Sequence, residues 1–126
     1  GCSDDGPTSP SQQVEITIDL SLPENRALAS VGGSLALSGN DLDEKGILLY
    51  RASEMTVEAY SRKCTHKGCV IGEFKNGVST CPCHSSMFNT SGEVVNGPAT
   101  NPLKEYTTAI NGDIVTVNPL SEAPLR

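Results

Sequence analysis

The 126-residue chain has no tryptophan, and its five aromatic side chains amount to only 4% of the residues. A hydrophobic core must therefore be assembled from Val, Ile, Leu and Ala, which favours strands over packed aromatic rings. No apolar run approaches the roughly 18 residues that a membrane-spanning helix needs. The length fits one domain of ordinary size.

Cations and histidines are also scarce. Nine basic residues stand against fifteen acidic ones, which gives a net charge of -6. Too few cations are present to neutralise a run of phosphates, so we expect no nucleic-acid partner. With only two histidines, the chain cannot form any site that requires three or more imidazoles. The acidic balance favours a protein partner with a basic docking face.

Twelve glycines and eight prolines predict many turns. Residues 14–20 alternate between apolar and polar side chains, as in a half-buried strand. Asn76-Gly77 and Asn111-Gly112 each lie between two apolar segments and predict tight hairpin turns. We expect one helical turn within residues 22–28 and strands at 14–20, 34–37, 47–51, 55–60, 70–74, 78–80, 106–110 and 114–117. The predicted fold class is all-β and antiparallel.

Residues 1–13 are rich in Ser, Pro, Asp and Gln and predict a flexible leader ahead of a single domain at 14–126. Cys2 stands alone in this leader. A bacterial lipoprotein signal peptide ends just before a cysteine that becomes the mature N-terminus and carries the lipid. Cys2 is therefore a predicted lipid anchor, and the following residues a tether. The alternative is a free thiol in a disordered tail.

The other four cysteines and both histidines lie in two short segments. These are Cys64-Thr65-His66-Lys67-Gly68-Cys69 and Cys81-Pro82-Cys83-His84-Ser85-Ser86. In each segment a cysteine is followed two or three residues later by a histidine. The first predicted hairpin lies between the segments and would place them side by side at one tip of the fold. Two thiols and two imidazoles would then converge there.

Two thiolates and two imidazoles suit either a zinc ion or an iron–sulfur cluster. Zinc sites usually take both cysteines from one element and both histidines from another, which is not the pattern here. A two-iron cluster would use each segment once per iron: Cys64 with Cys81, and His66 with His84. Cys69 and Cys83 would remain for a disulfide, which requires an oxidising compartment. Two structural disulfides with surface histidines are the metal-free alternative.

The two segments resemble the paired boxes of Rieske-type iron–sulfur proteins, C-T-H-x-G-C and C-P-C-H-x-S, at every fixed position. Ser91-Gly92 and Gly97-Pro98-Ala99 resemble the family's turn and the proline loop that covers a third side of the cluster. The resemblance implies a [2Fe–2S] cofactor in a cluster-binding subdomain, at about 61–103, inserted into an antiparallel β sandwich or barrel. The second cysteine pair resembles the disulfide-bearing subgroup of respiratory, photosynthetic and arsenite-oxidase Rieske proteins.

Four neighbouring residues are expected to surround and tune such a cluster: Ser86, Lys67, Phe88 and Pro98. Ser86 would donate a hydrogen bond to a bridging sulfide. Lys67 stands where the family often has a bulky apolar residue, and Ser85 replaces a frequent glycine. Phe88 stands where respiratory members tend to have a tyrosine that bonds a ligand sulfur. Without that donor we expect a reduction potential below the top of the Rieske range.

The resemblance implies one-electron transfer, with a protein redox partner docking at the exposed histidine edge. We expect the soluble domain of a carrier, or a subunit of a periplasmic oxidoreductase complex, in the periplasm or cell envelope and joined to the membrane only through a lipid on Cys2. Both histidines are used by the boxes, so a separate mononuclear oxygenase iron is excluded in this chain. The alternative function is a redox-sensing or structural iron–sulfur protein with no relay role.

Overall fold

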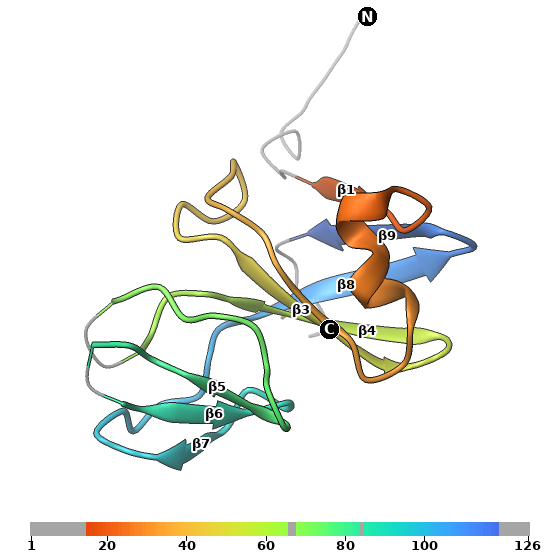
Figure 1. Ribbon diagram of the computed structural model, residues 1–126. Helices are drawn as coiled ribbons and strands as arrows, with labels where there is room; N and C mark the ends of the chain where they lie inside the picture. The colour runs from red at the N-terminus through yellow and green to blue at the C-terminus, as the bar shows by residue number, and fades with distance from the viewer. Residues whose placement is uncertain (1–14, 66–67, 84, 119–126) are drawn as a thin grey trace, which may run out of the picture.

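The computed structural model describes residues 15–65, 68–83 and 85–118, which form an almost entirely β structure (Figure 1). The elements are β1 (Ile16–Asp19), the 3-10 helix η3 (Pro23–Ala29), β2 (Ser34–Ala36), β3 (Ile47–Ser53), β4 (Thr56–Ser61), β5 (Val78–Thr80), β6 (Met87–Asn89), β7 (Val94–Asn96), β8 (Glu105–Asn111) and β9 (Ile114–Asn118). Within the described ranges, no helix has the length and apolar character to cross a bilayer. The predicted all-β fold class is confirmed.

Two antiparallel sheets organise the chain. The larger has the strand order β1-β9-β8-β4-β3-β2, and the smaller has the order β5-β6-β7. In Figure 1 the smaller sheet lies beyond one end of the larger one, on the side away from β1 and β9. The first and last described strands pair with each other, Ile16 opposite Val117. Strand β1 is therefore the edge of the larger sheet that lies away from the small sheet.

The strand pair β3–β4 separates two hydrophobic cores. Ile47 and Leu49 on β3 belong to the core of the larger sheet, whereas Leu48 between them belongs to the second core. On β4, Ala59 faces the first core and Tyr60, which lies opposite Leu48, faces the second. Successive side chains of a strand point to opposite faces. Burial on both faces explains why β3 begins with a continuous apolar run and not with alternation.

The strand predictions are confirmed for the larger sheet and wrong in part for the smaller one. The tight turn at Asn76-Gly77 forms, since Lys75 and Val78 exchange two main-chain hydrogen bonds and both turn residues have positive φ. Residues 70–74 are nevertheless not a strand, because β5 pairs with β6 instead. Strands β6 and β7 had not been predicted, since each has only three residues, too few to show a periodic pattern.

Tyr60 joins the two parts of the molecule. From β4 its hydroxyl donates to the carbonyl of Thr90 at 2.7 Å. Its ring lies edge-on to Phe74 with centroids 6.2 Å apart, and a β-carbon at Gly92 would come within 2.8 Å of it. Burial, followed by the nearby carboxylates, raises the pKa of Tyr60 far above its ordinary value, so the phenol stays neutral.

Two carboxyl groups meet where β4 pairs with β8, on the sheet face that also carries Tyr60. Glu105 lies opposite Tyr60, so Glu58 is its diagonal neighbour on the same face. Partial burial, a hydrogen bond with Glu58 and repulsion from its charge all raise the pKa of Glu105. The folded chain therefore binds this proton more tightly than the unfolded chain. The resulting stability is present below about pH 4.5 and is lost as the pH rises through the folded-state pKa.

Replacing Glu105 by glutamine removes the repulsion at neutral pH. We expect Glu105→Gln to raise the free energy of unfolding at pH 7 by about 0.2–1 kcal/mol, and this gain to shrink toward pH 4. Denaturant unfolding of both proteins between pH 4 and 7 measures it. Glu73→Gln, at an exposed glutamate outside the strands, is the control. Parallel pH profiles for wild type and Glu105→Gln would contradict the prediction.

Candidate metal centre

The first cysteine–histidine segment is the tip of a small hairpin. Lys63 and Val70 form a β-bridge at its stem. The N–H of Cys64 donates to the carbonyl of Cys69 at 2.8 Å, and the N–H of Gly68 donates back to the carbonyl of Cys64 at 2.8 Å. Gly68 has φ +79°, which side-chain-bearing residues rarely adopt. The main chain at Cys64 is thus fixed at the point where the loop closes.

The second segment repeats this arrangement between β5 and β6. The N–H of Cys81 donates to the carbonyl of Ser86 at 2.7 Å, and the N–H of Ser85 donates to the carbonyl of Cys81 at 3.0 Å. In both loops the cysteine is bonded to the residue five positions later and accepts from the residue four positions later. Ser85 corresponds to Gly68 and has φ +64°. Two equivalent loops therefore present Cys64 and Cys81.

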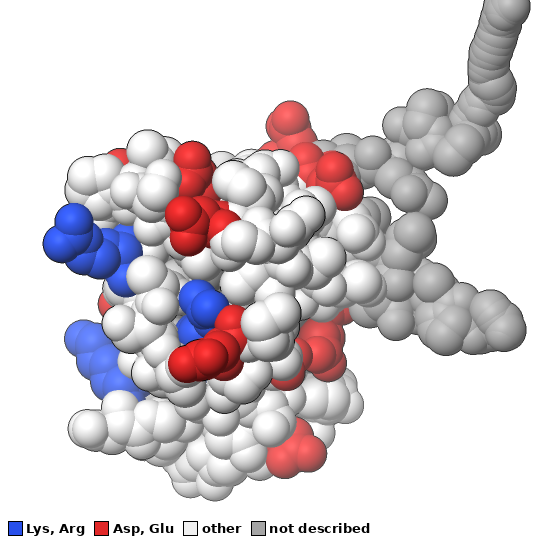
Figure 2. Space-filling view, turned by 90° about the vertical axis from the view of Figure 1, so that its right-hand side faces the viewer, with Lys and Arg blue, Asp and Glu red and all other residues white. Residues whose placement is uncertain are grey.

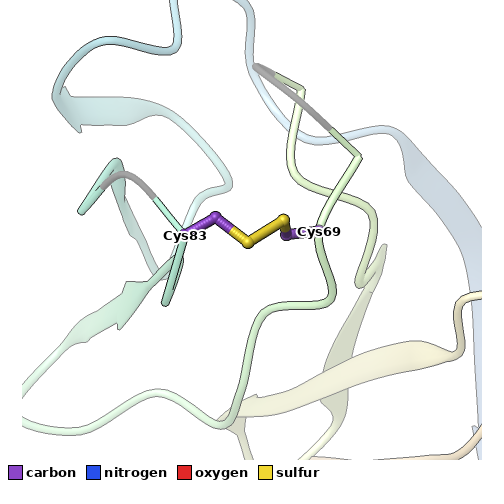
Figure 3. The surroundings of a disulfide bond; sticks show 2 residues. All are labelled: Cys69 and Cys83. Carbon is purple, nitrogen blue, oxygen red and sulfur yellow. A yellow bond between two sulfur atoms is a disulfide. The ribbon is translucent and has the colours of Figure 1, made fainter.

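A disulfide between Cys69 and Cys83 joins the two loops (Figure 3). Their Cα atoms are 6.4 Å apart, an ordinary separation for a disulfide. The predicted pairing is therefore confirmed. The sulfur of Cys81 lies within 4.8 Å of both disulfide sulfurs. Since two of these three sulfurs are bonded to each other, they do not form a metal site by themselves, and Cys81 is the one of the three that remains a thiol.

Cys64 and Cys81 take no part in a disulfide, and each is 1% exposed. Both belong to the second hydrophobic core, which also contains Leu48 from β3 and Phe88 from β6. Buried thiols that are kept out of a disulfide at the closing points of two linked loops suit a thiolate-bound iron centre. His66, Lys67 and His84 lie outside the described residues, so histidine ligation and the effect of Lys67 remain predictions.

The segment after β7 holds both loops. The N–H of Ala99 donates to Oγ of buried Ser86 at 3.0 Å, and Thr65 donates its hydroxyl to the carbonyl of Asn101 at 2.6 Å. Pro98, exposed and preceded by a cis peptide bond, lies in this segment. The bond from Ala99 leaves the Ser86 hydroxyl hydrogen to donate elsewhere, as a bond to a bridging sulfide requires.

The sequence singled out Phe88 as a neighbour of the centre but did not single out Thr65. Phe88 is completely buried in the second core, and its ring has no hydroxyl to donate to a ligand sulfur. Thr65 received no role from the sequence, although it lies between a predicted cysteine ligand and a predicted histidine ligand. Its position inside the first box was the available signal. Its partner, 36 residues away, was not evident.

An open groove of about 950 Å³ lies beside Cys64, which is one of its lining residues. Three of the chain's five lysines line it, together with two carboxylates: Lys45, Lys63, Lys104, Asp43 and Glu44. Figure 2 shows one face of the molecule, on which basic and acidic side chains are both present without a large area of one sign. The surroundings of Cys64 are therefore not uniformly acidic, and the net charge alone does not define a docking face.

Comparison with known families shows a match over residues 29–107 to the model of the Rieske [2Fe-2S] domain. The cytochrome b6-f complex iron-sulfur subunit of Gloeobacter violaceus is 32% identical over 113 residues, which are 86% of this chain and 60% of that protein. The corresponding subunit of Prochlorococcus marinus is 42% identical over 65 residues, 50% of this chain and 36% of that protein. The chain thus spans three fifths or less of these two relatives.

Solved structures agree with this match. The cyanobacterial plasma membrane Rieske protein PetC3 from Synechocystis PCC 6803 is 29% identical, with a TM-score of 0.57 over 67% of this chain and 84% of that protein. The ferredoxin of carbazole 1,9a-dioxygenase from Nocardioides aromaticivorans has a TM-score of 0.60 over 85% of this chain and 97% of that protein. It is 22% identical, so this second likeness concerns the fold alone.

The positive φ of Ser85 yields a stability prediction. A left-handed conformation costs a residue with a side chain about 1–2 kcal/mol. Glycine avoids this cost, but part of the gain is offset because glycine loses more conformational freedom on folding. We expect Ser85→Gly to raise the free energy of unfolding by up to about 1 kcal/mol. Ser85→Ala, which keeps the β-carbon, is the control and should not stabilise. Denaturant unfolding that gives equal values for the two variants would contradict this explanation.

Proposed function

Since the chain belongs to the Rieske [2Fe–2S] family, we propose that it transfers single electrons between protein partners, with Cys64 and Cys81 holding one iron of the cluster and His66 and His84 the other. The observation that carries this proposal is the pair of buried thiols at the closing points of two equivalent, disulfide-linked loops. When bound, the cluster supplies a one-electron carrier, and its two imidazoles reduce the negative charge of the ligand set.

The residues around the thiols have three tasks in this proposal. Main-chain hydrogen bonds fix Cys64 and Cys81 in position before any change of oxidation state. The second core excludes water from the thiolate side of the cluster. Ser86, whose Oγ accepts from the N–H of Ala99, would donate its hydroxyl hydrogen to a cluster sulfide. Such fixed surroundings favour fast electron transfer, because little has to rearrange when one electron is added.

The relatives support a cytochrome-containing complex as the setting. Those reported above from Gloeobacter and Prochlorococcus are iron-sulfur subunits of cytochrome b6-f complexes. We propose that this chain likewise serves as an electron-transfer subunit or carrier of a periplasmic oxidoreductase complex, with the partner docking at the histidine edge. Catalysis is assigned to the partner, because both histidines of this chain are committed to the boxes and none is left for a mononuclear iron.

The cysteines provide a direct test of the site. We expect Cys64→Ala and Cys81→Ala each to abolish assembly of the cluster, because each removes a thiolate from the same iron. The double variant Cys69→Ala/Cys83→Ala, which removes one half-buried and one exposed sulfur without touching a predicted ligand, should still bind it. Acid-labile sulfide, iron content and the EPR spectrum of the reduced protein are the measurements. Full cluster content in Cys64→Ala would overturn the assignment.

Redox cycling of the wild-type protein separates a relay from a purely structural cluster. A relay should accept one electron from dithionite, return it to ferricyanide and keep its iron and sulfide over repeated cycles. Loss of iron on each reduction would instead favour the structural role.

We also propose that the chain is anchored in the bacterial cell envelope through a lipid on Cys2. The support is a cysteine outside the two boxes that is followed by a Ser- and Asp-rich segment, together with the requirement of the Cys69–Cys83 disulfide for an oxidising compartment. Expressed with a lipoprotein signal peptide in a bacterial host, the protein should enter the detergent phase of Triton X-114, whereas Cys2→Ser should stay in the aqueous phase. Equal partitioning of the two proteins would exclude the anchor.

A further inference from the structure

Arg62 occupies the point where the chain leaves the larger sheet and enters the first loop. It directly follows β4, and its N–H donates to the carbonyl of Gly46 at 2.9 Å, which extends the pairing of β4 with β3 by one residue. Its carbonyl accepts from the N–H of Ile71 at 2.8 Å, across the stem of the loop. The main chain of Arg62 thus belongs both to the sheet and to the loop stem.

The guanidinium makes a second connection between the same two parts. Nε donates to the carbonyl of Ile71 at 2.8 Å, and Nη1 donates to the carbonyl of Leu37 at 2.9 Å, just beyond β2. Arg62 therefore binds both main-chain polar groups of Ile71 and ties that residue to the larger sheet. Ile71 is completely buried and lies in the same core as Cys64.

The surrounding chain leaves space for this side chain. Gly46 has φ +103°, and a β-carbon built on it would overlap the carbonyl oxygen of Leu37, which accepts from Arg62, and would stand 3.0 Å from Cδ of Arg62. A residue larger than glycine at position 46, just before the start of β3, would therefore clash with the Arg62 side chain.

We propose that Arg62 is a positioning residue for the cluster. Its guanidinium fixes the stem of the first loop to the larger sheet and so holds Cys64 at the orientation that the iron requires. The proposal rests on the cofactor of the family and not on the identity of the redox partner. Lysine cannot replace the arginine, because one ammonium does not reproduce two donors of a planar fork aimed at carbonyls on two segments.

Arg51 provides a matched comparison within the same fold. Its guanidinium also donates to main-chain carbonyls: Ser53 at 2.8 Å, Leu28 at 3.0 Å and Glu54 at 2.6 Å. Leu28 lies in η3, Ser53 is the last residue of β3 and Glu54 follows it, so all three acceptors lie outside the two cysteine–histidine loops. Removing Arg51 therefore removes similar hydrogen bonds without loosening the cluster loop. A general loss of stability should affect both variants, and a loss of positioning should affect only the Arg62 variants.

The experiment compares cluster-loaded wild type with Arg62→Lys, Arg62→Met and Arg51→Met. The rate of cluster release to a strong iron chelator is followed by loss of visible absorbance, and the reduced cluster is examined by EPR. We expect both Arg62 variants to release the cluster at least about tenfold faster than wild type and to show broadened EPR lines. Arg51→Met should lower the midpoint of unfolding but keep the wild-type release rate and line shape.

Every outcome decides the proposal. Wild-type release and line shape in Arg62→Lys would overturn it, as would equal acceleration in Arg62→Met and Arg51→Met. If Arg62→Met fails to fold, Arg62→Lys, which keeps the charge and most of the side chain, carries the test alone. Failure of the relay function would appear differently, as iron loss on reduction of the wild-type protein.

Discussion

The closure of each cysteine–histidine loop by its own main chain is the constraint on which the centre depends. At Cys64 and Cys81 the same two hydrogen bonds recur, one donated by the cysteine and one accepted by it. These bonds fix the main chain at both cysteines from local geometry alone. The disulfide then joins the loops, and the proline-containing segment after β7 bonds to each of them. The centre is therefore defined by two local closures, and longer-range contacts hold them against each other.

This division explains what the sequence predicted well. The two boxes are local, and their spacing is enough to indicate the pair of loops and the Cys69–Cys83 bond. Strands of the larger sheet were also predictable, because segments such as 106–110 and 114–117 are long enough to show a pattern around an Asn-Gly turn. The closure of the second loop by β5 and β6 was not predicted, since three-residue strands carry almost no periodic signal.

The contacts between the two parts of the molecule could not be predicted from the sequence, for a physical reason. Tyr60, Arg62 and Thr65 bond main-chain carbonyls that lie 30, 25 and 36 residues away in sequence. A carbonyl acceptor has no side-chain signature, so nothing in the sequence marks it as a partner. The net charge was uninformative in a related way, because an overall excess of acidic residues does not show that three lysines line the groove beside Cys64.

The double-sided burial of β3 makes the two cores depend on each other. Leu48 and Tyr60 lie on the face of the β3–β4 pair that borders the second core, and the opposite face of the same pair borders the first core. If the two loops detached after loss of iron, the face that carries Leu48 and Tyr60 would be exposed to water, while the opposite face of the β3–β4 pair stayed packed. The iron-free chain would then expose an apolar surface bordered by strands, the kind of surface that promotes self-association.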